Sequence, residues 1–255
     1  MANPVFSQTE QFKPGSTVGF DLPADGTESP LTGESTDRMT YEGVIVKAAT
    51  LFLLAAGAAV IVGMFFPDIS PALGMAAFVM SLVVAFGTSK PSPALYSITL
   101  TLWGGAVGGL SVRYEAAYGG IILQAVMGTA VVFAVALAVY RSGRIRDMRK
   151  VNRFLMIAVP AYVVFSLINL AMVTFGDFNM REVTITGTNI PFGLVLSIFA
   201  IAVGAFMLIS DFDFVANGVR KGLPSQWEWT AAYGLVFAII WIYLEMLRLL
   251  GYLRR

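Results

Sequence analysis

The chain has 255 residues, of which 57% are hydrophobic and only 13% are charged, and its formal net charge is +1. This balance points to neither a nucleic acid nor an acidic ligand as a partner. There is no cysteine and no histidine, which excludes disulfides, thiolate or imidazole metal sites and the usual nucleophile–base pairs of enzymes. Any proton-linked behaviour near neutral pH must therefore come from carboxylates.

Residues 1–43 differ in kind from the rest of the chain. They carry seven acidic residues against Lys13 and Arg38, and Pro, Gly, Ser and Thr fill most of the remainder. Such a segment buries too little apolar surface to offset its ordering entropy, so we expect a disordered acidic tail. It lacks the basic and apolar regions of a signal peptide. Its three phenylalanines could dock onto a membrane protein partner, or be isolated aromatics in a solvated tail.

Seven apolar stretches follow, and each is long enough for a membrane span. A hydrocarbon core about 30 Å thick needs roughly 20 apolar residues in a helix. The sequence therefore predicts an all-α polytopic membrane protein, with residues 44–255 forming a seven-helix transmembrane domain in the lipid bilayer. The expected spans are residues 45–66, 71–87, 94–112, 119–140 and 154–175, a sixth ending near Ser210, and a seventh from Trp227 or Trp229 to Tyr252.

The third expected span contains two overlapping pairs of small residues. Gly104 and Gly108 form one pair and Gly105 and Gly109 the other. Small residues four positions apart let another helix backbone approach closely, which is the ordinary packing device in membranes. A channel-lining role for the same glycine face is the alternative.

The strongest topological signal is the loop between the fourth and fifth spans. Residues 141–153 hold six basic residues and only Asp147 with the opposite charge. Short loops this basic stay in the cytoplasm, which places the N-terminus on the cytoplasmic side of the cell membrane. Seven full spans would leave Arg254 and Arg255 outside, so either the charge rule fails there or the last helix does not cross completely.

Few ionisable residues reach the membrane region. Glu245 lies in the apolar run of the seventh span, and Asp211 and Asp213 stand where the sixth is expected to end. Two carboxylates brought together would titrate as a coupled pair and could bind a hard cation such as Ca²⁺. Alternatively, Glu245 and Arg248 neutralise each other at i and i+3, and the two aspartates are wet interfacial residues.

Two polar side chains inside expected spans are weaker site residues. Gln124 in the fourth span and Asn169 in the fifth could line a polar path, although hydrogen bonding between helices is their other role. No HExxH, GxSxG, Walker A or dinucleotide-binding motif is found in the sequence. We therefore expect a protein that is not an enzyme and needs no cofactor.

Three segments resemble the Bax inhibitor-1/YccA-like membrane proteins. Met127–Ala130 match an MGTA-type stretch that opens the family's fourth helix. LISDFDFV resembles the close of the sixth helix and places the family's first pore aspartate at Asp211. IYLEMLRLL resembles LYLDFxNLF of the seventh and places the second acid at Glu245. The actinobacterial branch, with its longer acidic tail, is most similar.

The resemblance implies a fold and an activity. The implied fold is seven helices with the C-terminal helix central. The implied activity is a pH-sensitive Ca²⁺ leak in the plasma membrane, with Asp211 and Glu245 as a gating pair and transient metal ligands. A non-enzymatic regulator of a membrane quality-control protease or respiratory assembly is the alternative, and a proton-coupled solute transporter is a third.

Three features depart from the family's pattern, and the first is that the second span has no acidic or basic residue that could gate the pair. The second acid is glutamate, and it lies about ten residues further from the first than the family implies. If the seventh helix is straight from Trp229, Glu245 lies about 24 Å from its start and the pair cannot form.

Overall fold

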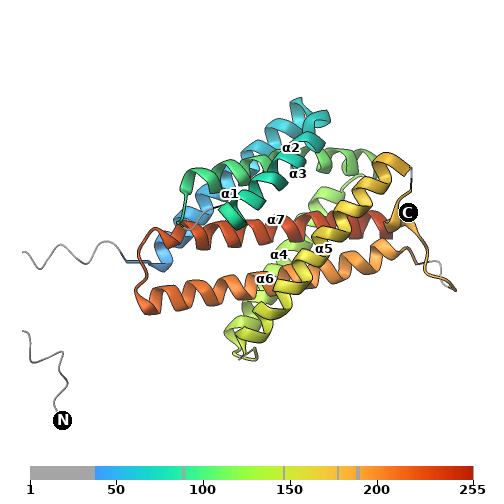
Figure 1. Ribbon diagram of the computed structural model, residues 1–255. Helices are drawn as coiled ribbons and strands as arrows, with labels where there is room; N and C mark the ends of the chain where they lie inside the picture. The colour runs from blue at the N-terminus through green and yellow to red at the C-terminus, as the bar shows by residue number, and fades with distance from the viewer. Residues whose placement is uncertain (1–37, 88–89, 146, 177, 188–189, 255) are drawn as a thin grey trace, which may run out of the picture. The chain divides into compact units, whose positions relative to one another are not determined.

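The computed structural model describes residues 38–87, 90–145, 147–176, 178–187 and 190–254. Seven α-helices make up most of this part of the chain, with two short 3₁₀ helices, η3 and η4, between them (Figure 1). Their bounds are α1 Tyr41–Phe65, α2 Ser70–Gly87, α3 Pro93–Ala117, α4 Ile121–Arg141, α5 Met148–Gly176, α6 Phe192–Lys221 and α7 Trp227–Leu253. The predicted all-α class is confirmed for these residues. The predicted disordered tail is residues 1–43, and its residues 1–37 lie outside the described part of the chain.

Several helices run further than the hydropathy pattern predicts. α1 begins at Tyr41, inside the expected tail, because the Thr40 hydroxyl accepts a hydrogen bond from the Gly43 amide and caps the helix. α6 continues past Ser210 to Lys221 and ends where Gly222 adopts a left-handed conformation (φ 63°). Asp211 and Asp213 therefore lie within α6. Polar side chains at a membrane interface change the hydropathy of a helix without breaking its backbone hydrogen bonds.

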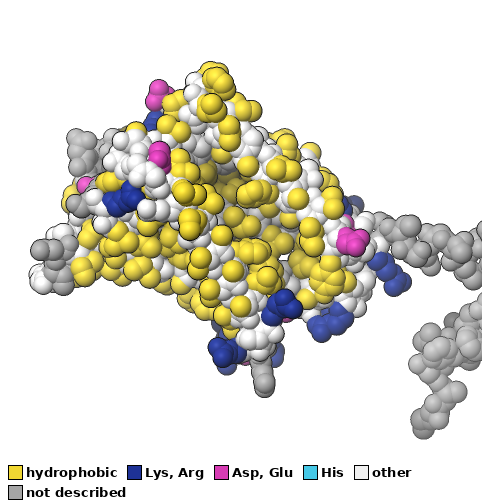
Figure 2. All heavy atoms as spheres, turned by 180° about the vertical axis from the view of Figure 1, so that it is seen from behind, with side chains coloured by type: hydrophobic (Ala, Val, Ile, Leu, Met, Phe, Trp, Pro, Cys, Tyr) yellow, Lys and Arg dark blue, Asp and Glu magenta, His cyan; other side chains and the backbone are white. Residues whose placement is uncertain are grey.

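The outer surface of the bundle is apolar. Large hydrophobic side chains on the helices are extensively exposed, such as Ile45 (66%), Met156 (77%) and Ile157 (67%). Figure 2 shows hydrophobic side chains spread over one face, with charged side chains gathered at its margins. All seven α-helices are long and apolar enough to span a membrane. The protein is thus a multi-pass membrane protein whose exposed apolar surface faces lipid.

The bundle has two chemically different ends. The basic end carries the α4–α5 and α6–α7 connections, and Ser210 of α6 donates a hydrogen bond there to Asn152 of α5 (2.8 Å). The opposite end carries the α3–α4 turn and the segment between α5 and α6. Arg254 donates to the Gly119 carbonyl (2.8 Å), so the last helix reaches that end. α7 therefore runs the full length of the bundle, about 40 Å for its 27 residues.

α7 is the central helix. It packs against α1, α3, α4 and α6, and a side chain of α5 also reaches it. Its buried positions follow the helical period on more than one side, with Ala232, Ala238 and Ile242 fully buried. A helix buried on several sides needs small or aliphatic residues around most of its circumference, which its sequence provides.

The glycines of α3 bring it into backbone contact with α1. A Cβ added at Gly104 would meet the Ala55 backbone, and one at Gly108 would lie 2.6 Å from Ala59 Cα. The two helices run in the same direction and stay in register over these successive turns. The packing role of the glycine face is therefore confirmed.

A polar contact joins the start of α1 to the start of α7. The buried Glu228 carboxylate accepts a hydrogen bond from the Thr40 amide (2.7 Å) and pairs with the Lys47 ammonium (2.6 Å). The Met39 amide donates to the Leu223 carbonyl beside it (2.7 Å). We call the contacts of Thr40 and Lys47 with Glu228 the α1–α7 clip.

The glycine contact yields a stability prediction. Gly108→Ala should lower the free energy of unfolding by about 1–3 kcal/mol, because the new methyl group must push α1 away. Gly57→Ala is the matched control, since a Cβ at Gly57 meets nothing within 4 Å. Thermal unfolding in detergent measures both variants. Equal stability of the two would contradict the close packing of α1 on α3.

Candidate functional site

Glu245 is a carboxylate buried inside the bundle, 2% exposed, on the central helix. Its Oε1 atom accepts hydrogen bonds from the Tyr162 hydroxyl of α5 and from the Arg248 guanidinium, one turn further along α7. Arg181 completes the group, with its Nη1 atom 3.9 Å from Glu245 Oε2. Two arginines thus surround one buried acid. We call these four residues the Glu245 cluster.

Arg181 reaches the bundle interior from the segment between α5 and α6. This segment folds as the short helix η4 (Met180–Glu182), whose first amide donates to the Asn169 side chain of α5 (2.8 Å). The Arg181 guanidinium donates to the Tyr162 hydroxyl (2.7 Å) and lies over the Tyr162 and Phe165 rings. The side chain is consequently buried although it belongs to a loop.

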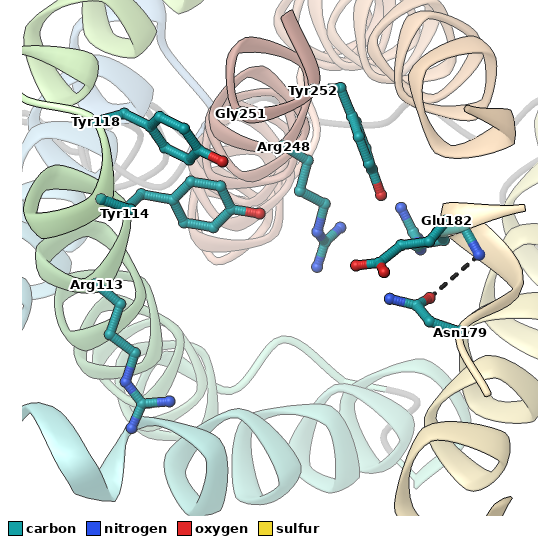
Figure 3. A pocket seen from close by; sticks show the side chains of 10 residues that line it. Arg113, Tyr114, Tyr118, Asn179, Glu182, Arg248, Gly251 and Tyr252 are labelled. Atoms are coloured by element: carbon teal, nitrogen blue, oxygen red, sulfur yellow. Dashed lines mark hydrogen bonds between the residues drawn. The ribbon is translucent and has the colours of Figure 1, made fainter. Parts of the chain in front are cut away.

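A cavity of about 340 Å³ opens beside the cluster at the opposite end of the bundle. In Figure 3, Arg248 and Glu182 point toward the same space, with Tyr114 facing them from α3. Arg113 and Tyr252 also line the cavity. The Glu245 cluster therefore lies next to an opening that both arginines of the cluster help to line.

Asp211 lies in a different environment near the basic end. It is partly buried on α6 and faces Gly234 of α7, where a Cβ would be 2.7 Å from its Oδ1 atom. A cavity of about 410 Å³ borders it. Among the described residues, none forms a hydrogen bond or an ion pair with the Asp211 side chain.

The structure does not bring Asp211 and Glu245 together. α6 and α7 are antiparallel, with Asp211 opposite Gly234 and Gly204 opposite Ile242. Glu245 follows Gly234 by 11 positions on a continuous helix, which is about 16 Å. The additional residues between the two acids belong to the extension of α6 to Lys221. Asp211 and Glu245 therefore lie in two separate places and do not form a carboxylate pair.

The remaining predicted site residues lie away from both acids' contacts. Asp213 accepts a hydrogen bond from Asn217 one turn later (2.7 Å). Gln124 lies on the exposed face of α4. Asn169 holds the loop of Arg181 in place. No group of three or more acidic side chains that could hold a metal occurs in the described residues.

Three important residues were not recognised from the sequence as site residues. Arg181 stands in a polar segment that hydropathy assigns to a loop, and Tyr162 stands in an apolar span without any local signal. Glu228 stands between two tryptophans, a pattern that is typical of residues at the membrane–water interface. The one available signal was the i, i+3 pair of Glu245 and Arg248, whose contact the structure confirms.

The fold and this cluster define a multi-pass α-helical membrane protein with an ionisable cluster inside its bundle. The family model described as Bax inhibitor 1 like matches residues 3–255. The chain belongs to that family, which confirms the resemblance found in the sequence. No protein in the curated comparison matches the chain.

The buried charges yield a second stability prediction. Glu245→Gln should cost about 3–5 kcal/mol of folding free energy, because it leaves the buried Arg181 without its counter-charge. Asp68→Asn removes a partner from the exposed pair with Arg113 (3.5 Å) and should cost less than about 1 kcal/mol. Unfolding in detergent measures both.

A double variant tests the cause. Arg181→Gln combined with Glu245→Gln should be more stable than Glu245→Gln alone, since only Arg248 is then left without a counter-charge, instead of both arginines. A double variant less stable than the single one would contradict the assignment of Glu245 as the counter-charge of Arg181.

Proposed function

We propose that this protein is a pH-sensitive cation leak channel whose path follows the contact between α6 and α7. The observation that carries the proposal is the buried Glu245 carboxylate within a membrane-spanning helix. Ionisable residues inside a membrane are costly to bury, and most mark a pathway for ions or protons. Glu245 is 2% exposed and is flanked by two arginines.

The two cavities supply the two halves of the path. Asp211 borders the cavity at the basic end, and the Glu245 cluster borders the cavity at the opposite end. Between them, Leu208 of α6 packs with Ala238 and Ile242 of α7, and all three side chains are fully buried. This apolar plug separates the halves, so the arrangement corresponds to a closed channel.

Protonation of Glu245 is the opening step in this proposal. While ionised, Glu245 attracts Arg181 and holds its loop against the bundle. The charged and titratable groups around it are Tyr162 of α5, Arg181 and Glu182 of η4, and Arg248 of α7. A proton on Glu245 removes the attraction and leaves two arginines that repel each other. Loss of the Glu245 charge therefore releases the loop, and cation flux rises.

The direction of the path follows from the charge of the loops. The basic end carries most of the cationic loop residues, which favours a cytoplasmic position for it and for the N-terminus. The protein would then lie in the plasma membrane with its C-terminus outside. Ca²⁺ is the proposed principal cation.

Flux through the purified protein in liposomes tests the proposal. Ca²⁺ flux should be higher at about pH 5 than at about pH 8, which is the direction that the proposed gating requires. Glu245→Gln should abolish the pH dependence and Asp211→Asn should reduce the flux. Glu245→Asp and Asp213→Asn are matched controls that should keep both properties.

Absence of flux above that of empty liposomes at every pH would reject the channel. The working function would then be the alternative, a non-enzymatic regulator of a membrane quality-control protease or a respiratory assembly.

The apolar plug gives an independent prediction. Ile242→Ala removes a fully buried side chain from the plug and should raise the flux several-fold at a constant pH. Ile198→Ala, the same change at a 53% exposed position of α6, should leave the flux unchanged. Equal flux through the two variants would show that the path does not cross Ile242.

A further inference from the structure

The cavity beside Asp211 has an unusual combination of side chains. It has a volume of about 410 Å³ and lies at the basic end, between α3, α6 and α7. One acid and four aromatic rings contribute to its lining: Asp211, Tyr96, Phe214, Trp227 and Tyr233. A path for a hydrated inorganic cation does not require this many rings.

The four rings form two pairs from different helices. Tyr96 of α3 stacks on Tyr233 of α7 with ring centroids 4.9 Å apart. Phe214 of α6 lies against Trp227 of α7 with centroids 6.4 Å apart. These contacts hold the rings in fixed positions around the cavity. Tyr233 is also stacked on Phe237 with centroids 5.8 Å apart, so both of its faces are covered by other rings.

Asp211 supplies a carboxyl group that forms no ion pair with any described residue. Gly234 leaves room for the carboxylate, since a side chain there would meet its Oδ1 atom at 2.7 Å. Lys90 is the other charged residue of the lining, but it is exposed and forms no ion pair with Asp211. A partly buried carboxylate is stabilised by a cation that enters the cavity.

We propose that this cavity binds a small organic ammonium ion, a quaternary or methylated amine, with Asp211 as its counter-ion. Aromatic faces attract such cations and replace their weak hydration shell. Ca²⁺ instead needs six to eight oxygen ligands. The cavity offers only the Asp211 carboxylate and a few hydroxyls, and those of Tyr96 and Thr230 are hydrogen-bonded to each other (3.0 Å).

This binding site goes beyond the proposed channel and does not depend on it. Binding in detergent requires neither a membrane potential nor an open path. A failure to bind the amine would not contradict the proposed Ca²⁺ leak, and a protein without Ca²⁺ flux could still bind the amine.

Equilibrium dialysis of the full-length protein in a nonionic detergent, with radiolabelled tetramethylammonium, tests the proposal. We expect saturable binding that Asp211→Asn weakens by about tenfold or more and Phe214→Leu by about threefold. Asp213→Asn is the matched control, because it removes a carboxylate two positions away that does not line the cavity. Lys90→Ala should strengthen binding by removing a like charge from the lining.

Two competition experiments distinguish the alternatives. Neutral tert-butanol, of similar size, should not displace the label, and Ca²⁺ should displace it no better than Na⁺ at equal ionic strength. Displacement by tert-butanol would show an apolar cavity without charge selectivity and overturn the proposal. Preferential displacement by Ca²⁺ would assign the cavity to the path of inorganic cations and overturn the proposal. Unchanged binding of tetramethylammonium by Asp211→Asn would overturn it as well. Phe214→Leu keeps every charge, so it tests the rings even if Asp211→Asn fails to fold.

Discussion

The charge on Glu245 is the constraint on which the arrangement of this bundle depends. An isolated carboxylate cannot remain ionised in an apolar interior. The chain meets this requirement with Arg248 from the same helix, Tyr162 from α5 and Arg181 from η4. The ion pair of Arg181 with Glu245 thus holds the loop of η4 against the bundle. Asn169 and the Phe165 ring complete the support of that loop.

The antiparallel register of α6 and α7 decides how the acids can work. Small residues set this register, because Gly204 admits the Ile242 side chain and Gly234 admits the Asp211 carboxylate. A shift of about three turns would be needed to join Asp211 with Glu245. Close packing along the two helices opposes such a shift, so each acid acts with its own neighbours.

The sequence predicted the seven spans, the basic end and the packing of the α3 glycines, because hydropathy and small-residue spacing are local properties of a membrane helix. It predicted the extent of α6 poorly, since Asp211 and Asp213 lower hydropathy but leave the helix intact. It identified Glu245 and Arg248 through their spacing. Arg181 and Tyr162 could not be assigned, because their contacts with Glu245 join segments separated by more than sixty residues and leave no local pattern.

The α1–α7 clip has a consequence for biosynthesis. The Thr40 amide and the Lys47 ammonium at the start of the first span are satisfied by Glu228, 188 residues after Thr40. Chains enter the membrane from the N-terminus, so α1 is inserted long before its partner is synthesised. Every nascent chain that ends before α7 carries an uncompensated lysine on its first helix. The α1–α7 clip can therefore form only in chains that have been synthesised through the start of α7.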